Sequence, residues 1–296
     1  MINIPTVFVL GAGSSAPYGF PTGQQLLNNV CRDSLSTEVT AELYAHCGFK
    51  GQEIAYFRQA LMQSGLTSVD AFLEHRTEFL EIGKAAIAIE LIRLEDTARL
   101  FNDYQGAWLK YLYGKMNTTF DNFGKNNVSF LTFNYNRLLE EFLFTSLRNT
   151  YGKSVEDTAA QLNKIPVIHL HGAIGSLPWQ GGPIRSFETN VNTKTLDIAR
   201  AGIKIIHEDI TDGRDKDFAR GTDLIQKAQR IVFLGFGYNR LNMKRLGIER
   251  SNVFALGTGT GLTSAEVQDS VIASANKINI HQATDCLDLL SSLSWA

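Results

Sequence analysis

Six short apolar runs recur along the chain, each bounded by glycine or polar residues. They are rich in β-branched and aromatic residues and do not alternate cleanly between apolar and polar, which is typical of strands buried on both faces of a parallel sheet. The predicted strands are Val7–Leu10, Val128–Leu131, Val167–Leu170, Ile231–Leu234, Val253–Leu256 and Ile278–Ile280.

Helical patterns, with apolar residues close to a 3.6-residue period, lie between most of these runs. The clearest are Arg137–Asn149, Asp217–Gln229 and Asp285–Leu293. Strands that alternate with helices predict an α/β fold with a Rossmann-like, doubly wound parallel sheet. We expect residues 1–296 to form a single domain.

One region breaks this alternation. Residues 24–116 show no convincing strand but long helical stretches, such as Ser68–Phe79 and Ala85–Phe101. We therefore predict a helical insertion module at 24–116, after the first strand and its turn. Residues 117–127 are expected to lead back to the sheet, and Gly172–Asn192, with its Gly, Pro and Ser residues, is expected to loop over a site.

Composition narrows the classes of partner. The chain carries 28 Lys and Arg against 30 Asp and Glu, a formal charge of −2, which argues against nucleic acid or an anionic membrane as partner. No apolar run approaches the ~18 residues of a membrane helix, and the N-terminal residues lack the features of a signal peptide. The 3 cysteines are scattered, which suits reduced thiols rather than a disulfide framework. We expect a cytoplasmic protein.

The first predicted strand ends in the glycine-rich turn Gly11-Ala12-Gly13-Ser14-Ser15. Its spacing is that of turns whose backbone N–H groups approach a pyrophosphate, although a turn needed only for packing is the alternative. An ordinary dinucleotide dehydrogenase is disfavoured, because its second strand should follow within a unit of about 30 residues. Leu26–Phe49 shows no such strand.

Polar residues follow the second predicted strand. Thr132, Asn134 and Asn136 would share one face if the extended conformation continues. They would then lie at the carboxyl end of a strand, where open α/β sheets bind ligands. The alternative is a capping turn, with Asn136 as the N-cap of the following helix.

Two histidines follow the third predicted strand. His169 and His171 are expected to point to one face, and Gly172 lets the chain turn away. A neutral imidazole is the natural general base at cytosolic pH. A hydrogen-bonded core histidine and half of a metal site are the alternatives, although no third ligand lies at a suitable spacing. The acidic segment 207–217 is either a solvated loop or a cation site.

Two more glycine turns follow later strands, Gly235-Phe236-Gly237 and Gly257–Gly261. Together and in order, the four elements resemble the sirtuin NAD-binding fold, and most closely the bacterial sirtuin-like proteins of anti-phage defence. Gly11–Ser15 resembles the phosphate loop Gly-Ala-Gly-x-Ser, residues 132–136 resemble Thr-Gln-Asn-Ile-Asp, and His171-Gly172 matches the catalytic His-Gly.

This resemblance implies NAD+ as the substrate, bound along the strand ends. It implies that Asn134 holds the nicotinamide ribose and its attacking water, and that His171 acts as general base on the ribose hydroxyls. The implied binding residues are Gly11, Ala12, Gly13, Ser14 and Ser15 for the pyrophosphate, Pro21 and Thr22 in a loop over the nicotinamide end, Asn136 for the carboxamide, Gly235, Phe236 and Gly237 in place of the Gly-Thr-Ser turn, and Asp285 and Cys286 beside adenine.

Three departures from the family pattern bear on the reaction. Asn136 stands where the family has aspartate, and Thr22-Gly23-Gln24 replaces the Asp-Phe-Arg of protein deacetylases. No Cys-x-x-Cys pair lies between His171 and Gly235, so we expect no zinc lobe and no metal. The last two departures point away from peptide deacylation and towards water as acceptor.

The resemblance therefore implies an NAD+ glycohydrolase that releases ADP-ribose and nicotinamide and depletes NAD+ in anti-phage defence. Such an enzyme must be held inactive, so we expect control by homo-oligomerisation, by a separate sensor protein, or by both. The alternative is a non-enzymatic module that senses NAD+ or ADP-ribose and signals to a partner, which Asn136 favours. A protein deacylase or ADP-ribosyltransferase is the least favoured interpretation.

Overall fold

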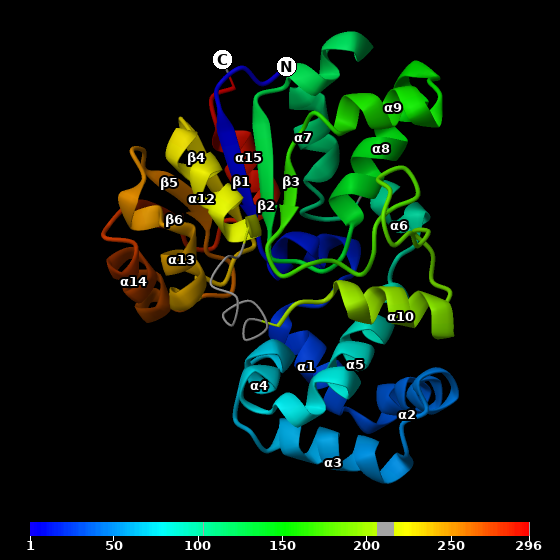
Figure 1. Ribbon diagram of the computed structural model, residues 1–296. Helices are drawn as coiled ribbons and strands as arrows, with labels where there is room; N and C mark the ends of the chain where they lie inside the picture. Colours follow the sequence, from blue (N-terminus) through cyan, green and yellow to red (C-terminus); the bar gives the residue numbers. More distant parts are fainter. Residues whose placement is uncertain (103, 206–215, 296) are drawn as a thin grey trace.

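A six-stranded parallel sheet forms the centre of the computed structural model, which describes residues 1–102, 104–205 and 216–295, apart from the side chains of 33–37 (Figure 1). All six expected strands are present. They are β1 (Thr6–Leu10), β2 (Val128–Thr132), β3 (Val167–His169), β4 (Arg230–Leu234), β5 (Ala255–Thr258) and β6 (Ile278–His281). β5 begins later than expected. The Ser251 hydroxyl accepts from the Val253 N–H and donates to the Val253 C=O, and these bonds hold Val253 in a turn.

The strand order is β3-β2-β1-β4-β5-β6. The chain therefore builds outwards from β1 to β3 and then returns to the other side of β1, which is the order of a Rossmann-like, doubly wound sheet. The predicted fold class is confirmed. The order reverses between β1 and β4, which pair from Thr6↔Arg230 to Leu10↔Leu234. Open α/β sheets bind their ligands outside the carboxyl ends of the strands at such a point.

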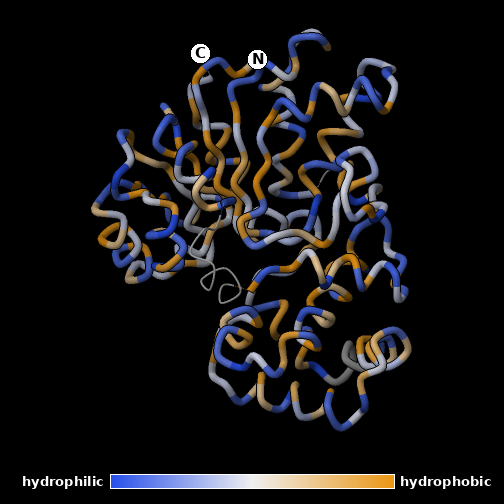
Figure 2. The backbone as a smooth tube through the Cα atoms, in the orientation of Figure 1, coloured by the Kyte–Doolittle hydropathy of each residue, from blue (hydrophilic) through white to orange (hydrophobic). Residues whose placement is uncertain are grey.

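Helices cover both faces of the sheet, so successive strand residues are apolar. Phe8 packs into the cluster on one face and Val9 into the cluster on the other, and Figure 2 shows the apolar residues concentrated along the central strands. One face carries α7 (Leu109–Met116), α8 (Leu138–Tyr151), α9 (Val155–Leu162) and α15 (Cys286–Ser292), and the other carries α12 (Lys216–Lys227), α13 (Arg240–Leu246) and α14 (Ser264–Ala273).

The described part of residues 24–116 is helical, but its two long helices are each broken. Ser68–Phe79 becomes α4 (Val69–His75) followed by a short 3-10 turn, and Ala85–Phe101 is divided between two helices because Asp96 caps the second of them, accepting from the Ala98 N–H at 2.9 Å. The helices before α7 are α1 (Gly23–Cys31), α2 (Asp33–Glu42), α3 (Gly51–Met62), α4, α5 (Leu80–Ile92) and α6 (Thr97–Phe101).

Helices α1 to α5 form a lobe that faces the carboxyl ends of the strands, and α10 (Thr193–Gly202) packs against α5 of this lobe (Figure 1). In contrast, α6 and α7 pack against α8 beside the sheet. The helical region is therefore divided between the lobe and the layer that covers the sheet. No described helix combines the length and the apolar character that crossing a bilayer requires.

A buried ionic triad fixes the irregular segment after β3. Arg137 donates from Nε and Nη2 to the Glu95 carboxylate at 3.0 and 2.5 Å, and Arg185 donates to the same carboxylate. The relative exposures of Glu95, Arg137 and Arg185 are 0%, 1% and 3%. Arg137 also donates to the carbonyl oxygens of Arg185 and Ser186 at 2.6 and 3.0 Å. The triad thus joins the α5–α6 connection, the start of α8 and the 172–192 segment.

Candidate active site

Two glycine-rich turns meet, backbone against backbone, where the strand order reverses. The Gly11 N–H donates to Leu234 O at 3.0 Å, and the Gly13 N–H donates to Gly235 O at 2.9 Å. A Cβ on Gly11 would lie 2.5 Å from Gly235 O, and one on Gly235 would lie 1.9 Å from the Ser14 nitrogen. The close contacts thus require glycine at these positions, and the amides of Gly11 and Gly13 are already bonded to the protein's own carbonyls.

Replacing Gly235 by alanine should destabilise the protein by about 3 kcal/mol or more, because a φ of +56° costs a side chain ~1–2 kcal/mol and overpacking costs ~1–3 kcal/mol. Gly237→Ala is the matched control, since nothing lies within 4 Å of its Cβ position, and it should change stability by less than ~0.5 kcal/mol. Urea unfolding measures both. Equal stability of the two variants would contradict the close contact of the turns.

Asn134 is held by bonds from three of its polar groups. Its N–H donates to the Thr132 hydroxyl at 3.0 Å, and its C=O faces Nδ1 of His169 at 2.8 Å. Its side-chain amide nitrogen donates to Gly11 O at 3.0 Å and to the Ser15 hydroxyl at 3.1 Å. Because a carbonyl oxygen can only accept, these bonds fix the orientation of the carboxamide. Oδ1 takes part in none of them, so it is the atom of Asn134 that can act on a ligand.

Thr132, Asn134 and Asn136 lie close together, since all three line a small void of about 10 Å³ with Ser14 and Ser15, although β2 ends at Thr132 and the strand does not continue through Asn136. The Asn136 amide donates to the Ser15 hydroxyl at 3.1 Å. It does not cap α8, whose N-cap is Arg137 without a side-chain cap bond. Asn136, Ser14 and Ser15 therefore form a buried polar network that fixes the first glycine turn to the end of β2.

His171 is buried against aromatic rings. Its imidazole meets the Phe133 ring edge to face at 5.1 Å, and its exposure is 8%. Nε2 is buried, and none of the described residues forms a hydrogen bond with it. Burial lowers the pKa of His171 to about 4, and the nearby Asp70 carboxylate opposes this fall. The ring is therefore neutral at pH 7, and it lines a cavity at the strand ends. Gly172, at φ +73°, turns the chain immediately afterwards.

His169 does not share a face with His171, which corrects the expectation from the sequence. β3 ends at His169 and the next two residues form a turn, so the alternation of side chains does not continue. His169 lies on the side of α8, where Nε2 is 2.6 Å from the Glu140 carboxylate. With Asn134 O beside Nδ1, both ring nitrogens face acceptors, and both must carry protons. His169 is thus an imidazolium that positions Asn134.

The pKa values of His169 and His171 should be shifted in opposite directions from the ordinary imidazole value of ~6.5. Burial disfavours the charged form of His169, but the Glu140 carboxylate outweighs it and raises the pKa; the pKa of Glu140 is lowered in spite of its burial, chiefly by His169. NMR titration of the imidazole signals, assigned with His169→Gln and His171→Gln, should show one pKa above ~6.5 and one near 4. Two ordinary values would contradict both environments.

The sign of the effect on stability follows from linkage. His169 stabilises the fold fully below pH ~6.5 and loses this contribution as the pH rises through its raised pKa. Glu140 stabilises it above pH ~4.3 and loses its contribution as the pH falls. His171, with a lowered pKa, costs stability as the pH falls from ~6.5 towards 4.

A cavity of about 280 Å³ brings the strand ends and the helical lobe together. The lobe contributes Asp70 and Glu74 from α4, and the Tyr135 hydroxyl, after β2, donates to the Asp70 carboxylate. The strand ends contribute Gly11, Ala12, Phe133, Asn134, His171, Phe236 and Gly237. Sequence reasoning missed the two carboxylates, because Ser68-Val69-Asp70 is also an ordinary helix start: Ser68 accepts from the Ala71 N–H at 3.1 Å.

Nine residues expected at the cofactor do not line this cavity: Gly13, Ser14, Ser15, Pro21, Thr22, Asn136, Gly235, Asp285 and Cys286. Pro21 lines a second cavity, and Thr22 caps α1, accepting from the Gln25 N–H at 3.4 Å. Asp285 caps α15, accepting from the Asp288 N–H at 2.8 Å. Cys286 is buried, and burial raises its pKa to about 12, so it is a thiol at neutral pH. The structure gives Thr22 and Asp285 a role as helix caps.

Among the described residues, no group of three or more His, Cys, Asp or Glu side chains is placed to hold a metal ion. Most of the acidic segment 207–217 lies outside the described residues. Comparison of the chain with models of known protein families gives no match, and comparison with curated proteins gives none either.

Proposed function

We propose that the protein is a sirtuin-like NAD+ glycohydrolase that acts in the cytoplasm. The observation that carries the proposal is the cavity at the reversal of strand order, which Gly11, Asn134 and His171 line together. These residues come from the ends of three different strands, and the chemistry of the proposal needs Asn134 and His171 near one sugar ring and Gly11 near the diphosphate. The order of motifs in the sequence supports the same conclusion.

In the proposed reaction, the bond between C1′ of the ribose and the nicotinamide nitrogen breaks, and its electron pair stays on nicotinamide. Positive charge develops on the ribose, and fixed dipoles and carboxylates stabilise such charge in a water-poor cavity. Asn134 and Asp70 line the cavity, and Asn134 Oδ1 and the Asp70 carboxylate are suited to that role. Water then adds to C1′ to give ADP-ribose.

His171 would accept the proton that the attacking water loses, directly or through a ribose hydroxyl. Its low pKa keeps it neutral and able to accept. Asp70 faces the imidazolium that would form, and opposite charge stabilises it. Asp70 belongs to α4 of the lobe, so movement of the lobe would change the position of Asp70 relative to Asn134 and His171. This is the route by which we propose that self-assembly or a separate sensor protein controls the enzyme in anti-phage defence.

The test is to incubate the purified protein with NAD+, with and without an extract of phage-infected bacteria, and to separate the products. The proposal predicts nicotinamide and ADP-ribose in equal amounts in at least one condition. If nicotinamide is released in neither, the enzymatic proposal fails. Binding of NAD+ without release would instead support a sensor module, which the burial of Asn136 against Ser15 favours.

A further inference from the structure

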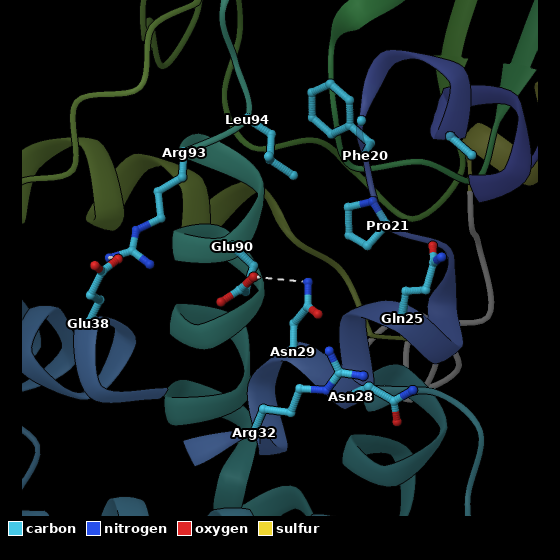
Figure 3. Close-up of a pocket in the computed structure, with 12 residues that line it drawn as sticks. Phe20, Pro21, Gln25, Asn28, Asn29, Arg32, Glu38, Glu90, Arg93 and Leu94 are labelled. Atoms are coloured by element: carbon cyan, nitrogen blue, oxygen red, sulfur yellow. Dashed lines mark hydrogen bonds and ion pairs between the residues drawn. The ribbon is translucent and has the colours of Figure 1, made fainter. Parts of the chain in front are cut away.

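A second cavity, of about 630 Å³, lies between α1, α5 and the loop that follows the first glycine turn (Figure 3). No described residue lines both this cavity and the one at His171. Phe20, Pro21 and Leu94 give it an apolar wall, and polar and charged side chains of α1 and α5 form the rest. The cavity therefore offers both hydrocarbon contact and electrostatic recognition.

Glu90 lines this cavity with a carboxylate that is only partly satisfied. The residue is 7% exposed, and Figure 3 shows its side chain between α5 and α1. Oε2 accepts from the Asn29 amide at 3.4 Å, whereas Oε1 is buried and has no hydrogen-bond partner among the side chains that the structure describes. A buried carboxylate oxygen without a donor costs free energy. An N–H group in the cavity would remove this cost.

The charges around Glu90 also favour a cation. Arg93 lies 3.4 Å from Glu38 and 3.1 Å from Glu42, so its charge is shared between two carboxylates. Oε2 of Glu42 is a second buried carboxylate oxygen to which no described residue donates. Arg32 also lines the cavity. The described charged groups in and beside it are therefore three carboxylates and two guanidinium groups: Glu38, Glu42, Glu90, Arg32 and Arg93. Burial raises the pKa of Glu90; Arg93 and Asn29 oppose this rise, and Glu42 and Glu38 add to it.

We propose that this cavity binds a small organic cation, an alkylamine or alkylguanidine, whose N–H groups donate to Glu90 Oε1 while its carbon chain packs against Phe20, Pro21 and Leu94. Cationic side chains in proteins divide their contacts in this way, with an apolar stem and a charged head. The Phe20 N–H donates to Ser15 O at 3.3 Å. The ligand would therefore contact the segment that leads out of the first glycine turn.

Isothermal titration calorimetry of the full chain with agmatine and with spermidine tests this proposal without any measurement of NAD+ hydrolysis. Wild type and the control Glu156→Gln, an exposed glutamate on α9, should bind with the same Kd. Glu90→Gln should bind at least ~10-fold more weakly, because a hydrogen bond to a charged group is lost. Each cation should also raise the Tm of wild type but not of Glu90→Gln.

The pH dependence in wild type provides a readout that needs no variant. Protons compete with the cation for Glu90, so the affinity should fall as the pH is lowered through the raised pKa of this carboxyl. The proposal is overturned if neither cation binds at ~10 mM, the weak limit for a specific small-ligand site, or if Glu90→Gln binds as well as wild type. Displacement of bound agmatine by NAD+ would also overturn it, by assigning the cavity to the substrate.

Discussion

Replacing Glu95 by glutamine should destabilise the protein by about 3–5 kcal/mol, because it leaves two buried guanidinium groups without a counter-charge. Glutamine has nearly the same shape, so the loss reports on charge rather than on a cavity. Arg137 and Arg185 are 1% and 3% exposed and cannot turn to solvent without moving the segment after β3. In a chain of this size the Tm should fall by roughly 10 °C.

Urea unfolding and differential scanning calorimetry measure this effect. The exposed residue Glu156 gives the matched control, and Glu156→Gln should change stability by less than ~0.5 kcal/mol. A Glu95→Gln variant within ~1 kcal/mol of wild type would show that the triad is not buried in solution.

Replacing His171 by alanine should lower kcat of NAD+ hydrolysis by about 10²–10⁴-fold, the usual contribution of a positioned general base. The fold should survive, since Nε2 makes no hydrogen bond to lose. In wild type, the acid limb of kcat/KM should lie near pH 4 rather than near 6.5, because burial holds the pKa of His171 at about 4.

The exposed His281 provides the control for this variant. His281→Ala should retain the activity of wild type at every pH. If His171→Ala retains more than about half of the wild-type kcat, His171 is a core histidine rather than the base.

Much of the fold could be predicted, because strands that are buried on both faces of a sheet consist almost entirely of apolar residues. At a surface, the run Ile231–Leu234 would expose four apolar side chains to water. β4 lies where that run predicted it, and these residues are buried. That Thr132, Asn134 and Asn136 lie together at the end of β2 was also predictable, since all three belong to the few residues at and just after the end of a buried strand.

The rest depends on contacts that local patterns do not encode. The turn after β3 places the side chains of His169 and His171 on different sides. The alternation of side chains along a strand does not indicate where the strand ends. Asp70 reaches the cavity because α4 lies across the strand ends, a packing choice between segments far apart in the chain. Likewise, Arg93 and Arg99 lie within four residues of Glu95 in the sequence, but the partners that it bonds, Arg137 and Arg185, arrive through tertiary structure.

A crystal structure of the protein with ADP-ribose tests the central claim most directly. The account predicts that the distal ribose lies between the side chains of Asn134 and His171, with Asp70 beside it and the diphosphate next to Gly11 and Ala12. A ribose bound elsewhere, for instance in the cavity of Glu90, or an absence of ADP-ribose at saturating concentration, would contradict it.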